Sequence, residues 1–225
     1  MTAQPIVILG GFLITSEAYE PMRRWLEARL LQPVLVVPAT RLDWLATVQA
    51  WGWARLLDRT AELVRRQVAR SPTGKVTLIG HSSGGVMLRL FLAEQPFEGR
   101  VYGGKALADR LVMLGSPHTA LKATALRQRV DRLYPGAWFA DQVAYVSVAG
   151  DLDLADGSAT ARRLAPGSYR AISGSAQVRG DGLVPVDSAS LAGSRTLVLP
   201  GVAHGGAFGP RWYGTPEVVA QWWCE

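Results

Sequence analysis

One short stretch, residues 75–85, limits the folds open to this chain more than any other part. It reads Lys-Val-Thr-Leu-Ile-Gly-His-Ser-Ser-Gly-Gly. Residues 76–79 form a short run typical of a buried strand, and residues 84–93 are apolar and uninterrupted enough for a buried helix. We therefore expect a strand, a sharp turn and a helix in direct succession, with Ser82 at the turn.

The five residues from Gly80 to Gly84 fit Gly-x-Ser-x-Gly, the nucleophile elbow, in which a strained turn raises a serine hydroxyl above a sheet. Such a turn brings positions 80 and 84 close to each other and to a neighbouring strand, so side chains there would clash. The helix places its positive N-terminus beneath Ser82, and we expect the Ser83 backbone N–H to bind a developing oxyanion. A glycine-rich turn without chemistry is the alternative that these five residues leave open.

Further apolar runs along the chain predict a sheet around this turn. Five of them read as strands, at residues 6–9, 34–37, 111–114, 144–149 and 196–199. Helical stretches separate the strands, including an amphipathic one over residues 57–68 and a closing one over 212–223. We therefore predict an α/β fold with a mostly parallel sheet of about six strands and helices on both faces.

The length of 225 residues suits one domain, and we expect a single domain over residues 1–225. Residues 151–179 are rich in small residues and contain no clear periodicity. We predict that this segment is an irregular loop excursion within the domain.

The first predicted strand ends in Gly10-Gly11-Phe12-Leu13. In an open α/β sheet the loops at the carboxyl ends of strands line the ligand crevice, so we expect this turn beside Ser82. The Phe12 backbone N–H is our second oxyanion donor, with that of Leu13 as the alternative, and Gly11 and Leu13 are expected to contact substrate. A tight turn of structural importance only is the other interpretation.

The chain offers three histidines as the base that a serine nucleophile requires. His204 follows the last predicted strand in Gly-Val-Ala-His-Gly-Gly, where a loop tip can bring its imidazole over Ser82. We therefore expect His204 to be the general base. His81, inside the elbow, is expected to be packed or to line the substrate pocket, and His118, after the strand at 111–114, is expected to line the acyl or alcohol side of that pocket.

Two aspartates compete to orient that base. Asp151 directly follows a predicted strand, whereas Asp181 lies between two glycines in the turn at residues 180–185. Either one satisfies the chain order serine, acid, histidine.

Together these motifs resemble the α/β-hydrolase superfamily and, within it, the small lipase and esterase branch. The resemblance rests on the elbow, on Ser-Pro-His at 116–118, on Asp-Gly-x-Val-Pro at 181–185 and on Gly-Val-x-His at 201–204, so it covers nearly the whole chain. It implies an α/β-hydrolase fold with little or no lid, and it favours Asp181 as the triad acid. One departure is Gly10-Gly11, where relatives commonly carry His-Gly.

The resemblance implies that the chain hydrolyses small-molecule or lipid carboxylic esters through an acyl-enzyme formed on Ser82. A thioesterase or an acyltransferase would use the same three residues. A non-catalytic binding protein on a hydrolase scaffold is the alternative from a different class. Apolar residues within 117–142 suggest a wall for an acyl chain, although ordinary core packing explains them equally well.

Composition excludes several other classes of protein. The net charge of +6 comes almost wholly from arginines scattered along the chain, which argues against a nucleic-acid surface and is compatible with weak contact to an anionic lipid surface. The single cysteine, Cys224, excludes an internal disulfide. No cofactor or metal is expected, because the histidines are far apart and the aspartates of 151–157 are wrongly spaced for a calcium loop.

The beginning of the chain contains no pattern typical of a secretory signal. Residues 1–5 lead directly into the apolar run at 6–9, without a charged segment or a long apolar segment. No apolar run approaches the roughly 20 residues of a transmembrane helix. We therefore predict a cytoplasmic protein, and the sequence predicts no particular oligomeric state.

Overall fold

The computed structural model describes residues 4–223, and Cys224 lies outside them. Within the described residues, six strands form one sheet in which all neighbouring strands are parallel. The strands are β1 (Ile6–Leu9), β2 (Val34–Val36), β3 (Val76–His81), β4 (Ala108–Leu114), β5 (Ala144–Asp151) and β6 (Arg195–Pro200). The predicted strands are therefore all present, and the largest differences in their ends are the extensions of β4 back to Ala108, of β3 to His81 and of β5 to Asp151.

The strand order is β2-β1-β3-β4-β5-β6. The chain moves outward from β1 to β2, then crosses back to β3 and continues in the opposite direction. Between β1 and β3 the order therefore reverses, which is where open α/β sheets bind ligands at the carboxyl ends of their strands. The loop after β1 and the elbow after β3 flank this point.

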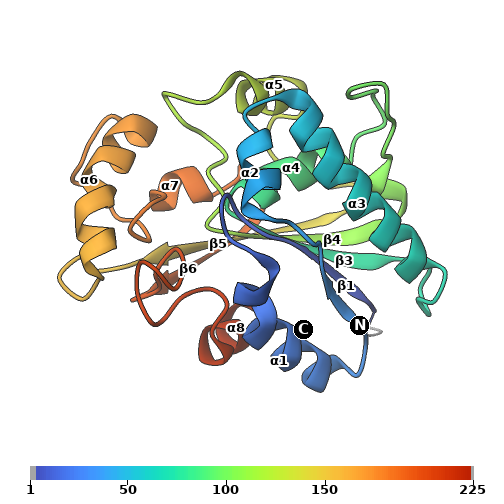
Figure 1. Cartoon of the computed structure of the whole chain (residues 1–225), viewed down its shortest axis with the longest axis horizontal. Coiled ribbons are helices and arrows are strands. Elements are labelled where there is room, and N and C mark those ends of the chain that lie inside the picture. Colours follow the sequence, from blue (N-terminus) through green and yellow to red (C-terminus); the bar gives the residue numbers. More distant parts are fainter. Residues whose placement is uncertain (1–3, 224–225) are drawn as a thin grey trace.

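Helices cover both faces of the sheet, as predicted (Figure 1). The helical elements are η1 (Ser16–Tyr19), α1 (Glu20–Leu30), α2 (Arg41–Ala46), α3 (Ala50–Val68), α4 (Ser83–Phe91), η2 (Gly104–Ala106), α5 (Ala125–Leu133), α6 (Ala159–Ser173), α7 (Val186–Ala189) and α8 (Pro216–Trp222), of which η1 and η2 are 3-10 helices.

Alternating side chains of β1 show how the two cores are divided. Val7 and Leu9 pack into one core together with α3, α4 and α5, whereas Ile6 and Ile8 pack into the other with α1 and α8. Successive strand side chains point to opposite faces, so a strand with all four residues buried must be covered on both sides. The continuous apolar runs of the sequence are explained by this double coverage.

The prediction that residues 151–179 are an irregular loop excursion is wrong over about half of this segment, because α6 occupies Ala159–Ser173. The Ser158 side chain accepts a hydrogen bond from the Ala161 N–H at the start of the helix, and Gly174 ends it in the left-handed conformation with φ of 87°. Pro166 lies inside the helix and obscures its signal in the sequence. Alanines on one side, Ala161 and Ala165, are buried.

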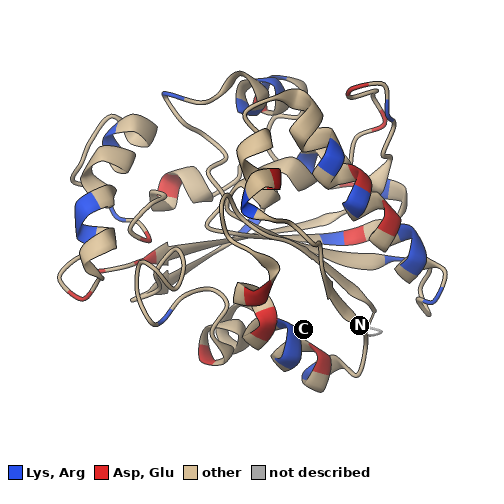
Figure 2. Ribbon diagram, viewed as in Figure 1, with Lys and Arg blue, Asp and Glu red and all other residues tan. Residues whose placement is uncertain are grey.

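Charged residues are distributed over the molecule. Figure 2 shows Lys and Arg on α1, α3, α5 and α6, with acidic residues beside many of them. Among residues 4–223, no helix combines the length and the apolar character needed to span a bilayer.

Candidate active site

The elbow forms where the sequence predicts it. β3 ends at His81 and α4 begins at Ser83, so Ser82 is the single residue between strand and helix. Its backbone has φ of 52° and ψ of −122°, a conformation that an L-residue rarely adopts. Strain of this kind costs about 1–3 kcal/mol and persists where the surrounding structure imposes it.

The two elbow glycines are required by close backbone packing. A Cβ at Gly80 would lie 2.4 Å from the Gly85 Cα, and one at Gly84 would lie 2.3 Å from the carbonyl oxygen of Leu9 on β1. Position 80 therefore faces the start of α4, and position 84 faces the neighbouring strand. The predicted reason for both glycines is confirmed.

Ser82, His204 and Asp181 lie in one hydrogen-bonded line. The Ser82 Oγ is 3.0 Å from the His204 Nε2, and the His204 Nδ1 is 2.8 Å from the Asp181 Oδ2. All three side chains are buried, with Ser82 the most accessible at 7%. Three separate segments supply them: the elbow after β3, the turn between α6 and α7, and the loop after β6.

The Asp181 carboxylate is held on both oxygens. Its Oδ1 accepts hydrogen bonds from the backbone N–H groups of Leu183 at 3.0 Å and Val184 at 2.7 Å. Its Oδ2 accepts one from the Tyr213 hydroxyl at 2.8 Å, in addition to that from His204. A carboxylate held in this way can orient an imidazole and stabilise its cation.

Tyr213 is a member of this cluster that the sequence analysis did not identify. It is fully buried, and its hydroxyl oxygen accepts a hydrogen bond from the Gly150 N–H at 2.6 Å. Burial, followed by the nearby Asp181 carboxylate, raises the pKa of Tyr213 well above its ordinary value. The hydroxyl therefore stays protonated and remains a donor to Asp181. Tyr213 lies nine residues beyond His204 in the sequence, and no motif around it indicates this role.

Asp151, the competing acid, is engaged elsewhere. Its Oδ2 forms an ion pair with Arg179 at 2.7 Å, and its side chain is 24% exposed. The structure therefore places Asp181, and not Asp151, against the His204 imidazole.

The two expected oxyanion donors lie on either side of Ser82. Ser83 is the first residue of α4, where helical N–H groups have no intrahelical acceptor, and Phe12 lies in the loop after β1. In the described part of the chain, no protein acceptor binds either N–H. A Cβ at Gly11 would lie 2.9 Å from the Ser82 Cβ, so this loop closely approaches the elbow. The roles of Phe12 and Ser83 as oxyanion donors, and of Gly11 and Leu13 as substrate contacts, stay predictions; the side chains of Phe12 and Leu13 are 42% and 40% exposed.

His81 and His118 do not occupy the positions expected of pocket residues. Both are buried in the interior, and both ring nitrogens of His81 are bound by protein groups, the Tyr19 hydroxyl and the His204 carbonyl. His118 lies with its Nδ1 3.4 Å from a guanidinium nitrogen of the buried Arg89. For His81 the structure agrees with packing, the first of its two expected roles. For His118, whose ring is enclosed in the interior, we correct the prediction of a pocket role.

The apolar residues of 117–142 pack mostly into the core. The core beneath α3 and α4 contains Tyr134 and Phe139, and it is also contacted by the partly buried Leu126 and Leu133. Leu121 and Trp138 are exposed. Core packing, the alternative to an acyl-chain wall, therefore explains four of these side chains.

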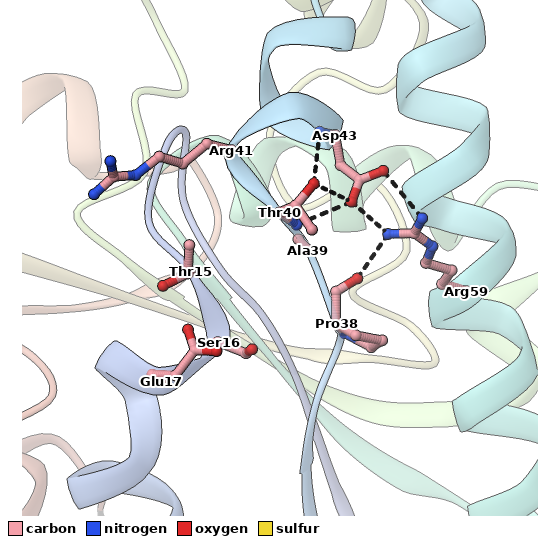
Figure 3. A pocket seen from close by; sticks show the side chains of 9 residues that line it. All are labelled: Thr15, Ser16, Glu17, Pro38, Ala39, Thr40, Arg41, Asp43 and Arg59. Carbon is pink, nitrogen blue, oxygen red and sulfur yellow. Dashed lines mark hydrogen bonds and ion pairs between the residues drawn. The ribbon is translucent and has the colours of Figure 1, made fainter.

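A cavity of about 380 Å³ adjoins the loop after β1 (Figure 3). Its walls come from η1 and from the segment after β2, and the ion pair of Arg59 with Asp43, at 2.9 Å, lies along one side. The Arg59 guanidinium holds the pKa of the Asp43 carboxyl well below its usual range. This cavity is not bordered by Ser82, His204 or Asp181, so it is separate from the site around the Ser82 hydroxyl.

Comparison with known proteins gives likeness of structure but not of sequence. No family model matches the chain, and no curated protein matches it. A solved structure from Xanthomonas campestris pv. campestris, assigned to the α/β superfamily of hydrolases, is 16% identical and covers 88% of this chain and 86% of its own, with a TM-score of 0.51. A gene product from Listeria innocua is 15% identical and covers 88% of this chain and 85% of its own, with a TM-score of 0.52. At these identities the likeness concerns the fold.

Proposed function

We propose that this chain, which has the α/β-hydrolase fold, is a serine hydrolase that cleaves carboxylic esters. The predicted fold is confirmed, whereas the activity is our inference. The observation that supports it most strongly is the hydrogen-bonded line from the Ser82 hydroxyl through His204 to Asp181. A hydroxyl becomes a nucleophile at neutral pH only when a base accepts its proton, and this line supplies both the base and the group that orients it.

In the first half of the proposed reaction, the Ser82 Oγ attacks the ester carbonyl carbon while His204 Nε2 takes the hydroxyl proton. The carbonyl π electrons move to its oxygen, which becomes the oxyanion of a tetrahedral intermediate. Asp181 stabilises the imidazolium on its Nδ1 side. Collapse of the intermediate breaks the bond to the alcohol oxygen, which leaves with the proton from His204, and the acyl group stays on Ser82.

In the second half, water attacks the acyl carbon and His204 accepts its proton. The second tetrahedral intermediate releases the carboxylic acid, and the proton returns to the Ser82 oxygen. The N–H groups of Phe12 and Ser83 are assigned to both oxyanions. Preorganised donors of this kind are worth about 10²–10³-fold in kcat each.

A carboxylic ester is the substrate class that we propose. The side chains of Phe12 and Leu13 are exposed beside the elbow and offer apolar contact to a small-molecule or lipid ester. Thioesters and acyl transfer to an alcohol would use the same groups, so the leaving group and the acceptor have to be measured.

The test is turnover of p-nitrophenyl butyrate by the wild type and by Ser82→Ala. Loss of the nucleophile should reduce kcat by at least about 10⁴-fold. Ser71→Ala is the matched control, because Ser71 lies in a turn after α3 and its Oγ is hydrogen-bonded to Thr73 of the same turn. Wild-type turnover by a folded Ser82→Ala protein would contradict the proposal, as would a wild-type protein that binds esters and thioesters but cleaves none.

A further inference from the structure

Behind the elbow, four groups form a continuous hydrogen-bonded chain that the proposed reaction does not use. The Gly11 N–H donates to the Tyr19 hydroxyl oxygen at 2.8 Å, and that hydroxyl lies 2.8 Å from the His81 Nδ1. The His81 Nε2 lies 2.8 Å from the carbonyl oxygen of His204. The Tyr19 and His81 side chains are fully buried.

Only one placement of the hydrogens satisfies every contact. A carbonyl oxygen can only accept, so the His81 Nε2 must carry the proton and donate it to His204. The Nδ1 of neutral His81 is then an acceptor, and the Tyr19 O–H donates to it. The Tyr19 oxygen keeps a lone pair for the Gly11 N–H, so no donor or acceptor in the chain is left over.

The surroundings keep both side chains in these forms. Burial and the neighbouring His204 lower the pKa of His81 well below its ordinary value. Burial raises the pKa of the Tyr19 hydroxyl. At neutral pH, His81 therefore stays neutral and Tyr19 stays protonated, which is the arrangement that the geometry requires.

This chain connects three segments that meet at Ser82. Gly11 precedes Phe12 in the loop after β1, His81 precedes Ser82 in the elbow, and His204 is in the loop after β6. The Tyr19 ring also occupies the space over Gly10, where an added Cβ would lie 2.7 Å from the ring. The loop that offers the Phe12 N–H is thus held against Tyr19 by both packing and a hydrogen bond.

We propose that Tyr19 and His81 are positioning residues, which fix the oxyanion loop through the Gly11 peptide and the catalytic base through the His204 carbonyl. The inference rests on the proposed function, since it assigns what holds that site in shape. Among the described hydrogen bonds, neither side chain binds the Ser82 Oγ or a ring nitrogen of His204, although the His81 ring packs against the His204 ring. Their effect is on how accurately the Phe12 N–H and the His204 imidazole are placed, and such placement matters most in the transition state.

The first variant is Tyr19→Phe, which removes one hydroxyl oxygen and leaves the ring over Gly10. We expect kcat for p-nitrophenyl butyrate to fall roughly 10-fold to 100-fold with little change in KM. Binding of a trifluoromethyl ketone, which forms a tetrahedral adduct, should weaken by a similar factor. A variant that is only less stable would lose active protein but keep the kcat of each folded molecule.

The matched control is Tyr102→Phe. The Tyr102 side chain is also buried, and its hydroxyl lies 3.1 Å from the Asp58 Oδ1 and 3.2 Å from the Ala54 carbonyl oxygen, two acceptors on α3 and away from the elbow. Removal of this hydroxyl should leave kcat and the affinity for the ketone unchanged.

A second variant, His81→Gln, places an amide nitrogen near the former Nε2, where it can still reach the His204 carbonyl, and removes the acceptor for Tyr19. Because both variants break the same Tyr19–His81 hydrogen bond, their effects should overlap. The kcat of the double variant should therefore fall by less than the product of the two single losses. Unchanged kcat in both single variants, or fully multiplicative losses, would overturn the proposal. Persistent turnover by Ser82→Ala is the separate result that would overturn the proposed function itself.

Discussion

His81 and His204 are two buried imidazoles with ring centroids 4.9 Å apart, and yet their surroundings suit them to opposite tasks. His204 lies between a carboxylate on Nδ1 and a serine hydroxyl on Nε2. His81 lies between a tyrosine hydroxyl on Nδ1 and a backbone carbonyl on Nε2. Only the first of these environments contains an anion that can stabilise the protonated ring.

The partners, and not the residue type or the burial, separate the two histidines. Proton transfer to His204 creates a cation beside Asp181, which four donors hold in place, including His204 itself. A proton added to His81 would have to enter at Nδ1 and would displace the hydrogen that Tyr19 donates there. His204 is therefore suited to exchange protons, whereas His81 is suited to hold a fixed geometry.

The largest expected effect comes from removing the anion that distinguishes His204. Asp181→Asn keeps the size of the side chain but replaces the ionised carboxylate by a neutral amide, so the tautomer and the charge of His204 are no longer favoured. We expect kcat for p-nitrophenyl butyrate to fall by about 10⁴-fold. The matched control is Asp151→Asn, which changes an aspartate paired with Arg179 and should leave kcat near that of the wild type. Equal losses in the two variants would contradict the assignment of Asp181.

A smaller effect should appear in the stability of the protein against pH. Burial lowers the pKa of both His81 and His118, with contributions from His204 and Arg89 respectively. The unfolded chain therefore binds protons near pH 6.5 that the native protein does not. The free energy of unfolding should be fully retained above about pH 6.5 and should fall below it, by up to about 1.4 kcal/mol per pH unit for each histidine.

Urea unfolding from about pH 8 to about pH 5 measures this slope. His118→Gln should remove the contribution of one histidine and flatten the slope accordingly, whatever the change in stability at pH 8. The same variant should keep the kcat of the wild type, because His118 makes no contact with the Ser82 line. A slope identical to that of the wild type would mean that His118 titrates alike in the folded and unfolded chains.

Much of the fold can be read from the sequence because its signals are local. The central strands β1 and β3 contain continuous apolar runs, since helices cover both faces of the sheet there, and the first strand is predicted to the residue. The helix α6 is missed because Pro166 and Gly167 resemble a break, although Ser158 and Gly174 supply ordinary caps at its ends. Caps and breakers compete in such a segment, and tertiary packing decides between them.

The hydrogen-bonded line at Ser82 also follows from motifs, since Ser82, Asp181 and His204 each lie in a recognisable turn. The residues that hold this line do not. Tyr19 and His81 are 62 residues apart in the sequence, and Tyr213 and Asp181 are 32 apart, and nothing in their local patterns indicates a contact. The strand order places β1 beside β3 and so brings Tyr19 near His81, whereas the contact of Tyr213 with Asp181 joins two segments outside the sheet.

The most direct measurement of the central claim is labelling by a fluorophosphonate, with the modified residue identified by mass spectrometry. We predict a single adduct on Ser82 of the wild type and much slower labelling of His204→Gln, because the probe reacts with a serine oxygen only when a base accepts its proton. Labelling at another residue, or an equal rate in the folded His204→Gln protein, would contradict the account.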